Sequence, residues 1–390
     1  MRKFLIIFLI LAIGFFYFYY QGIFERKIEI SLNNSIPLET SPKKLNSKNI
    51  IDVSDAFKFL LNKSRKSIYI AGLYFTSNID WRIKRDIRRA IKRGVHFKFL
   101  LQDSDFSKTE FSNLGLSKYT NVEVRFIDIS KLGNNKWGDF HNKYAIFDER
   151  YAILGSANFS YPAFYNNVEI NGLLVETNIV RKLVEIFLKD FNYAKNKVIH
   201  TQFFSRRLDI SNLFTNKIFL VETAPSEINS PEIPDNSEVI EYILKNSKKE
   251  ILLEIYAFTS NETNFPILFN LIKDSLKRNV EVKILIDKNN YDTKPYIKDC
   301  IDKLCKLGCK VNKLNIKKAS GEEFSAVHSK LLIVDRKYVL FGSCNWTKAG
   351  MQENRELSVV TTYTEFVNKF NEKFLSDFNS KFSEEVRCDK

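Results

Sequence analysis

Two stretches of the chain carry the same chemically reactive residue types at the same spacing. In the first stretch, His141 and Lys143 precede Asp148, and Ser156 and Asn158 follow within a Gly-Ser-x-Asn sequence. In the second stretch the same residue types recur at the same intervals, at positions His328, Lys330, Asp335, Ser343 and Asn345. The chain has only four histidines, and two of them occupy these matching positions. We therefore interpret the two stretches as the halves of one duplicated functional unit.

These residue types suit the cleavage of a phosphodiester. Lysine side chains can offset the charge on non-bridging phosphate oxygens, and Ser and Asn side chains supply neutral hydrogen-bond donors. Two histidines permit a double displacement, in which one imidazole attacks phosphorus while the other protonates the leaving alkoxide and then activates water. Asp148 and Asp335 stand where turns begin, so a catalytic role and a structural role are both open for them.

A matching glutamate follows each histidine. Glu169 lies 28 residues after His141, and Glu356 lies 28 residues after His328. A carboxylate that accepts a hydrogen bond from Nδ1 would hold each imidazole in the required tautomer. The spacing groups Glu169 with the first half-site and Glu356 with the second as histidine-orienting residues, and a surface position is the alternative for both.

The spacing within each motif predicts a β-hairpin. Residues 141–148 and 328–335 read as strands, in which the His and the Lys two positions later project from one face. Tight turns follow, and residues 151–156 and 338–343 return in the antiparallel direction. This return brings each Gly-Ser-x-Asn sequence beside the His and Lys of the same motif.

The repeat extends well beyond the motifs. Residues 68–78 (IYIAGLYFTSN) resemble residues 251–261 (ILLEIYAFTSN), and residues 88–105 resemble residues 273–290, where a basic helix runs into a strand. Strands that alternate with helices predict an α/β fold. We expect two tandem repeats that form a pseudo-twofold pair of mixed β-sheets flanked by helices, preceded by a transmembrane helix.

The order of these segments predicts the domain organisation. Lys27–Ser31 and Lys217–Glu222 read as the opening strands of the two halves, and three prolines between residues 201 and 237 indicate a connector. The predicted divisions are a transmembrane segment at 4–24, a linker with the first strand at 25–49, a first repeat at 50–200, the connector at 201–237, a second repeat at 238–380 and a tail at 381–390. Because one chain holds both halves, a monomer can form a complete site, and the oligomeric state stays open.

The amino terminus predicts a membrane anchor. Residues 4–24 contain no charge, and a helix of this length spans roughly 30 Å, enough to cross the hydrocarbon core of a bilayer. Ala12-Ile13-Gly14 leaves a cleaved signal peptide as the alternative. Arg2 and Lys3 precede the run, so the positive-inside rule directs the remainder of the chain outward. We expect a single-pass membrane protein with an extracytoplasmic catalytic domain.

Charge and cysteine content constrain the partners. The formal net charge of +14 suits nucleic acid, anionic lipid or phosphorylated substrates, although part of it follows from the Lys-rich, Asn-rich composition. The five cysteines fit no common zinc pattern, and a disulfide would require an oxidising compartment. Trp137 and Trp346 flank the two motifs, where they could line the site or pack in the core.

The duplicated motif resembles the HxKxxxxD signature of the phospholipase D superfamily. Both copies carry the signature with GSxN at the matching distance, and the resemblance covers nearly all of the chain after residue 50. The resemblance implies a metal-independent phosphodiesterase that needs no cofactor, in which His141 is the nucleophile and His328 is the acid–base. The sequences GSANFS and GSCNWTKAGMQENRE look most like the branch of phospholipase D-like phosphodiesterases and endonucleases.

The motifs leave open which groups lie on either side of the phosphate. A phospholipid is the predicted substrate, because an anchor would hold the site near a bilayer, and an alcohol in place of water would make the enzyme a phosphatidyltransferase. A nuclease that cleaves DNA or RNA is the first alternative, and the basic charge favours it. An inactive module that binds anionic ligands is the second alternative.

Overall fold

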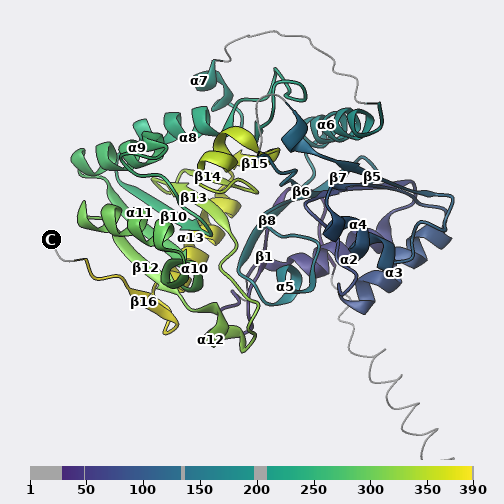
Figure 1. Ribbon diagram of the computed structural model, residues 1–390, viewed down its shortest axis with the longest axis horizontal. Helices are drawn as coiled ribbons and strands as arrows, with labels where there is room; N and C mark the ends of the chain where they lie inside the picture. The colour runs from purple at the N-terminus through teal and green to yellow at the C-terminus, as the bar shows by residue number, and fades with distance from the viewer. Residues whose placement is uncertain (1–28, 48, 133–136, 197–208, 389–390) are drawn as a thin grey trace, which may run out of the picture. The chain divides into compact units, whose positions relative to one another are not determined.

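The computed structural model describes residues 29–388, except residue 48 and the segments 133–136 and 197–208. The chain divides into two compact units, Met1–Ser31 and Leu32–Lys390. Both repeats lie within the second unit (Figure 1).

The first repeat forms an eight-stranded mixed sheet. Its strand order is β2 (Ile51–Asp52), β1 (Ile36–Thr40), β8 (Glu169–Leu174), β7 (Tyr151–Gly155), β6 (Lys143–Phe147), β3 (Ser67–Gly72), β4 (His96–Gln102) and β5 (Val122–Ile127). Strands β3, β4 and β5 are parallel, while β6, β7 and β8 are antiparallel to their neighbours. The predicted hairpin is therefore present as β6 and β7, at the centre of the sheet. Its first strand is shorter than predicted, because β6 begins at Lys143 and His141 lies before it.

The second repeat forms a second mixed sheet with the same central arrangement. Its strand order is β16 (Ser383–Glu385), β12 (Lys310–Leu314), β11 (Glu281–Asp287), β10 (Glu250–Ile255), β13 (Lys330–Val334), β14 (Tyr338–Gly342), β15 (Glu356–Thr361) and β9 (Ile218–Thr223). Here β13 and β14 form the predicted hairpin, and β10 to β12 are parallel. The predicted α/β fold with two mixed sheets is confirmed.

Helices flank both sheets. In the first repeat they are α2 (Val53–Lys63), α3 (Trp81–Lys92), α4 (Asp105–Asn113), α5 (Tyr161–Tyr165) and α6 (Thr177–Asn196). In the second repeat they are α7 (Ile210–Leu213), α8 (Asn236–Lys245), α9 (Pro266–Lys277), α10 (Lys288–Thr293), α11 (Pro295–Lys306), α12 (Ile316–Ser320) and α13 (Thr364–Phe378). Short helical turns also occur at Ile129–Lys131 and Ala349–Glu353.

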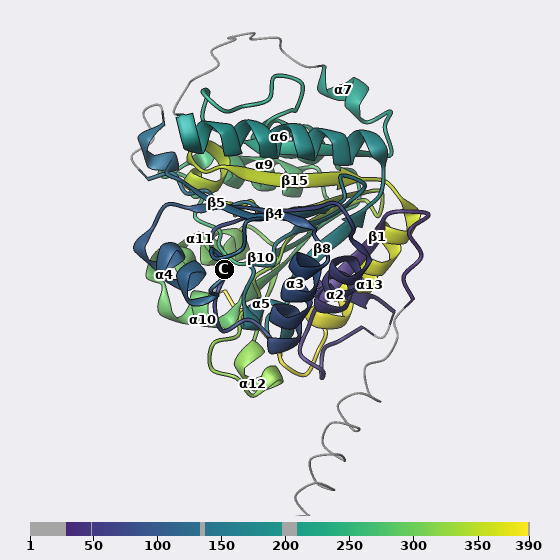
Figure 2. The same cartoon turned by 90° about the vertical axis from the view of Figure 1, so that its right-hand side faces the viewer.

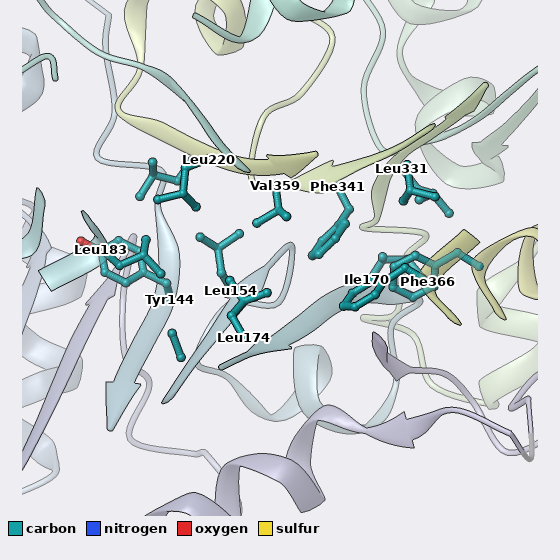
Figure 3. Packing of buried hydrophobic residues seen from close by; sticks show 14 of the residues in the cluster. Tyr144, Leu154, Ile170, Leu174, Leu183, Leu220, Leu331, Phe341, Val359 and Phe366 are labelled. Carbon is teal, nitrogen blue, oxygen red and sulfur yellow. The ribbon is translucent and has the colours of Figure 1, made fainter. Parts of the chain in front are cut away.

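One hydrophobic core joins the two repeats. Strands β7 and β8 pack against β14 and β15, and the apolar side chains on one face of these four strands belong to a single buried cluster (Figure 3). The long helices α6 and α13 add Leu183 and Phe366 to this cluster and lie on opposite sides of the paired sheets (Figure 2). Burial of apolar surface is the main driving force of folding, so the shared core ties each repeat to the other.

Two buried ion clusters lie beside this shared core. In one, the Arg355 guanidinium lies 2.9 Å from Asp190 on α6 and 2.6 Å from Glu222 on β9. In the other, Lys373 on α13 pairs with Asp377 and lies 3.8 Å from Glu39 on β1.

Burial strongly affects the acids of the second cluster. It raises the pKa of Glu39 to about 7, and it also raises the pKa of nearby Glu254 to about 7. Lys373 therefore supplies positive charge to a group of carboxylates that are costly to ionise.

Removing that cation should destabilise the fold. We expect Lys373→Met to lower the free energy of unfolding at pH 7 by about 3–5 kcal/mol, because Asp377 and Glu39 lose their counter-charge inside the protein. The matched control is Lys369→Met, one turn earlier on α13, which breaks only a surface pair with Glu365 and should cost less than about 1 kcal/mol. Urea denaturation of both variants measures the difference, and equal losses would contradict the buried role.

The first strand differs from its prediction. Of the predicted strand Lys27–Ser31, residues 29–31 have no regular structure and residues 27 and 28 lie outside the described part. The strand that enters the first sheet is Ile36–Thr40, which pairs antiparallel with β8 and is buried along most of its length. Glu29 and Ser31 are exposed and Ile30 between them is buried, but residues 29–31 pair with no strand of the described sheets. The predicted opening strand of the second half is present, one residue later, as β9.

The predicted membrane location requires correction. Within the described residues, no helix has both the length and the apolar character needed to cross a bilayer. The run at 4–24 on which the prediction rested lies outside the residues that the structure describes.

Candidate active site

The segment that carries each histidine is hydrogen-bonded to the opposite repeat. The backbone N–H of His141 donates to the carbonyl of Arg355 at 3.0 Å, and the N–H of His328 donates to the carbonyl of Val168 at 2.9 Å. Arg355 and Val168 immediately precede β15 and β8, respectively. Each histidine is therefore fixed beside the first residue of a strand in the opposite repeat.

As a result, each histidine is paired with the glutamate of the opposite repeat. Glu356, the first residue of β15, places its carboxylate oxygens 2.8 and 2.9 Å from Nδ1 of His141. Glu169, the first residue of β8, places both oxygens 3.0 Å from Nδ1 of His328. The grouping of each glutamate with the histidine of its own repeat was wrong. Within one sheet β7 separates β6 from β8 by roughly 10 Å, so the partner must come across the interface.

Two asparagines that the sequence analysis missed hold these glutamates in place. Asn354 donates to Glu356 Oε1 at 2.8 Å, and Asn167 donates to Glu169 Oε1 at 2.8 Å. Both asparagines stand two residues before their glutamate, so an Asn-x-Glu signal was present in each copy. Ser156 adds a further hydrogen bond to Glu169 Oε2 at 2.6 Å.

The carboxylates fix the tautomer of both imidazoles. An Nδ1–H that donates to a carboxylate leaves the lone pair of a neutral ring on Nε2, where it can act as nucleophile or base. Burial lowers the pKa of His141, and it lowers the pKa of His328 to about 4. Burial alone would raise the pKa of Glu169, but His328, Lys330 and Ser156 outweigh it and lower that pKa.

The two lysines stand beside the histidines and are almost fully buried. Lys143 Nζ donates to the carbonyl of His141 at 2.6 Å, and Lys330 Nζ donates to the carbonyl of His328. Burial lowers the pKa of Lys143 to about 8 and that of Lys330 to about 7. An anion between them would favour the charged form of both, because opposite charge raises the pKa of an amine.

Ser156 and Ser343 serve the strands as well as the site. Their hydroxyls accept the backbone N–H groups of Ile170 and Leu357, at 3.0 and 3.1 Å. Both hydroxyls are buried in these contacts, so their positions suit support of the glutamate strands. Asn158 and Asn345 differ, because no side chain or backbone group among the described residues bonds to their Oδ1 atoms.

Asp148 and Asp335 lie outside this cluster of side chains. Asp148 ends the hairpin strand that begins near His141, and its carboxylate accepts the backbone N–H groups of Arg65, Lys66 and Ser67. Asp335 accepts the equivalent three N–H groups in the second repeat. Both aspartates adopt positive φ angles in a turn. Of the two roles considered for them, the structure therefore shows the structural role.

One aromatic side chain breaks the symmetry of the site. The ring of Tyr256 lies edge-on to the His328 ring, with centroids 4.9 Å apart, and Lys330 Nζ lies 5.2 Å from the Tyr256 centroid. The equivalent position in the first repeat is Leu73, so comparing the two copies could have revealed the difference. Of the tryptophans that flank the motifs, Trp346 is buried in the core whereas Trp137 is 80% exposed.

The described residues bring together no group of three or more His, Cys, Asp or Glu side chains with metal-site geometry. The positive charges beside the two histidines are those of Lys143 and Lys330. Cys305 on α11 forms a disulfide with Cys388, while Cys300, Cys309 and Cys344 are buried and free. Of these, Cys344 stands between Ser343 and Asn345 of the second motif.

Comparison with known families agrees with this geometry. The family described as cardiolipin synthase, PLD-like domain, matches residues 58–191 and 240–378, one match in each repeat. The chain belongs to this phospholipase D family. The superfamily resemblance expected from the motifs is therefore confirmed, and its members among the relatives below are phosphodiester-processing enzymes.

Individual relatives match to different extents. Cardiolipin synthase 2 of Bacillus cereus (strain ATCC 14579) is 29% identical over 150 residues, which make up 38% of this chain and only 27% of that relative. Phospholipase D Y of Dictyostelium discoideum is 21% identical over 90% of this chain and 91% of its own length. The virion nicking-joining enzyme of vaccinia virus (strain Copenhagen) is 21% identical over 84% of this chain and 83% of its own length.

A solved structure shows the same fold across both repeats. The phosphatidylserine synthase of Haemophilus influenzae Rd KW20 superposes with a TM-score of 0.65 and covers 91% of this chain and 90% of its own chain. The sequence identity is 10%, so this phospholipase D fold is shared without close sequence similarity.

The exchange of glutamates predicts which histidine responds to which substitution. We expect Glu356→Gln to perturb the ring ¹⁵N resonances of His141 and leave those of His328 unchanged, and Glu169→Gln to do the reverse. With only four histidines, single His→Gln variants assign the signals. Both glutamine variants should lose about 100-fold or more in phosphodiesterase activity, because an unoriented imidazole is a poor catalyst. Perturbation of the histidine in the same repeat as the substituted glutamate would contradict the pairing across the interface.

Proposed function

We propose that this protein is a metal-independent phosphodiesterase that works through a phosphohistidine intermediate. The observation that carries the proposal is the pair of His–Glu contacts across the interface, each with a buried lysine beside it. Two oriented imidazoles and two ammonium groups are the parts that a double displacement at phosphorus needs.

In the first step, neutral His141 attacks phosphorus through Nε2. A phosphorus–nitrogen bond forms, the bond to the leaving oxygen breaks, and His328 gives its Nε2 proton to that oxygen. In the second step His328 removes a proton from water, the hydroxide attacks phosphorus, and the phosphorus–nitrogen bond breaks. Lys143 and Lys330 offset the charge on the non-bridging oxygens in both transition states.

The assignment of roles rests on the superfamily resemblance, and the position of Tyr256 adds a condition to it. Its ring packs on His328, whereas the equivalent position in the first repeat is Leu73, so the two imidazoles have different surroundings. A more apolar environment favours the neutral form of an imidazole in the free enzyme. The acid–base role then requires that His328 bind a proton when the anionic substrate is present.

The depressed pKa of His328 predicts a pH dependence. The free enzyme must carry a proton on His328 to expel an alkoxide, so kcat/KM for an alkyl phosphodiester should fall about tenfold per pH unit above pH 5. Deprotonation of Lys330 above about pH 7 acts in the same direction. A p-nitrophenyl ester, whose leaving group departs without a proton, should show a much shallower decline. Parallel profiles for the two substrates would argue against His328 as the acid.

A phospholipid is the proposed substrate. Support comes from the matched family, whose description names cardiolipin synthase, and from Phospholipase D Y, which matches over the length of both repeats. Two exposed aromatic side chains, Trp137 and Phe324, stand four residues before His141 and His328 and are 80% and 85% exposed. Aromatic side chains at such positions suit contact with the interfacial region of a lipid aggregate.

A nucleic-acid substrate is the second candidate. The virion nicking-joining enzyme matches both repeats over most of its length, and the net charge of +14 suits a phosphate backbone. The same exposed aromatic rings could stack on unpaired bases.

Substrate and mechanism can be tested together. The full chain should hydrolyse phospholipid vesicles in EDTA, and His141→Ala or His328→Ala should reduce the rate by about 10²–10⁴-fold. His96→Ala is the control, because His96 is exposed on β4 and far along the chain from both motifs. Single-stranded DNA is offered in parallel. Cleavage of DNA but not lipid would replace the proposed substrate, and full activity in either active-site variant would refute the mechanism.

A further inference from the structure

A second group of cations surrounds a pocket at the other end of the hairpin from His141. The pocket has a volume of about 480 Å³ and is lined by Lys63, Arg65, Lys66, Arg150, Asp148 and Tyr151. His141 and Asp148 stand at opposite ends of β6, seven residues and on the order of 20 Å apart. The pocket is therefore separate from the catalytic cluster.

The charge of the pocket is strongly positive. Both oxygens of Asp148, the acid in the lining, already accept backbone N–H groups. No ion pair with another described residue neutralises the four cations of the lining. The carbonyls at the end of α2, which would repel an anion, accept hydrogen bonds from Arg65 and Arg93. The positive charges also affect one another: burial and then the charge of Arg65 lower the pKa of Arg93.

In the second repeat, the aromatic ring of Phe214 occupies the pseudo-symmetric position. There Lys248, Lys249, Asp335, Lys337 and Tyr338 replace the corresponding residues of the first repeat. Phe214, which follows α7, packs edge-on against Tyr338 with centroids 5.0 Å apart and stacks on Tyr242 at 4.8 Å. In the first repeat, no described ring packs on Tyr151, and the Arg150 guanidinium lies 5.7 Å from its centroid.

We propose that this pocket of the first repeat binds a phosphate group, outside the active site. Arg and Lys are the side chains that bind phosphate through charge-assisted hydrogen bonds, and Arg can do so with two parallel bonds. The volume exceeds that of one phosphate group, so the ligand is a phosphate ester whose organic part packs on Tyr151. Its source is either a free phosphate monoester or the head group of a phospholipid.

The two repeats provide a matched pair of variants for the test. Lys66→Glu/Arg150→Glu reverses two charges in the pocket. Lys249→Glu/Lys337→Glu reverses the two equivalent charges where Phe214 fills the site, so both double variants have the same net charge. Glycerol 3-phosphate is titrated into the full chain of each at low salt by calorimetry, in a His141→Ala background that prevents turnover.

We expect the pocket variant to bind one equivalent of glycerol 3-phosphate about tenfold or more weakly than the parent, and the control variant to bind as the parent does. Equal binding by the two double variants would overturn the proposal. If Lys66→Glu/Arg150→Glu fails to fold, the same comparison applies to Lys66→Gln/Arg150→Gln against Lys249→Gln/Lys337→Gln.

Vesicles of phosphatidylcholine with and without phosphatidic acid identify the source of the phosphate. Weaker sedimentation of the pocket variant with phosphatidic acid vesicles, but not of the control variant, assigns the site to a lipid head group. A defect seen only with glycerol 3-phosphate assigns it to a free ester. No difference in either assay overturns the site itself.

Discussion

The candidate active site depends on a hydrogen bond that neither repeat can make alone. Each imidazole needs a carboxylate on Nδ1, and the carboxylate comes from the first residue of a strand in the opposite repeat. The backbone bonds from His141 to Arg355 and from His328 to Val168 set this alignment before any side chain is considered. Because the core between the sheets is shared, a shift of one repeat against the other would separate both His–Glu pairs at once. The packing of the core and the geometry of the candidate active site thus depend on the same interface.

The sequence could predict the local structure within each repeat. Period-two strands, a turn that begins at Asp148 or Asp335 and a returning Gly-Ser-x-Asn segment are local patterns, and they reappear as β6–β7 and β13–β14. The pseudo-twofold arrangement also followed, because two copies of one half-site need a shared interface to act together.

Contacts between the repeats could not be predicted from spacing. Glu169 and Glu356 stand at equal distances from their own histidines, so the sequence is compatible with either pairing. The role of Asp148 depends on three N–H groups more than 80 residues away. The burial of Trp346 depends on the core of the second repeat, where its ring packs on Phe258, 88 residues earlier. The opening strand was misplaced because Lys27–Ser31 alternates like a strand, whereas burial selects Ile36–Thr40.

The buried ion clusters show that the two repeats differ in the charged residues that they contribute to the interface. The acids are equivalent: Asp190 and Glu222 in one cluster correspond to Asp377 and Glu39 in the other. The cations are not equivalent, since Arg355 corresponds to Val168 and Lys373 corresponds to Ile186, and the second repeat supplies both.

A twofold assembly of two first repeats would bury Asp190 and Glu39 of both copies with neither Arg355 nor Lys373 as a counter-charge. The first repeat therefore depends on the second for charge as well as for a carboxylate, so it is not suited to form this interface with a copy of itself.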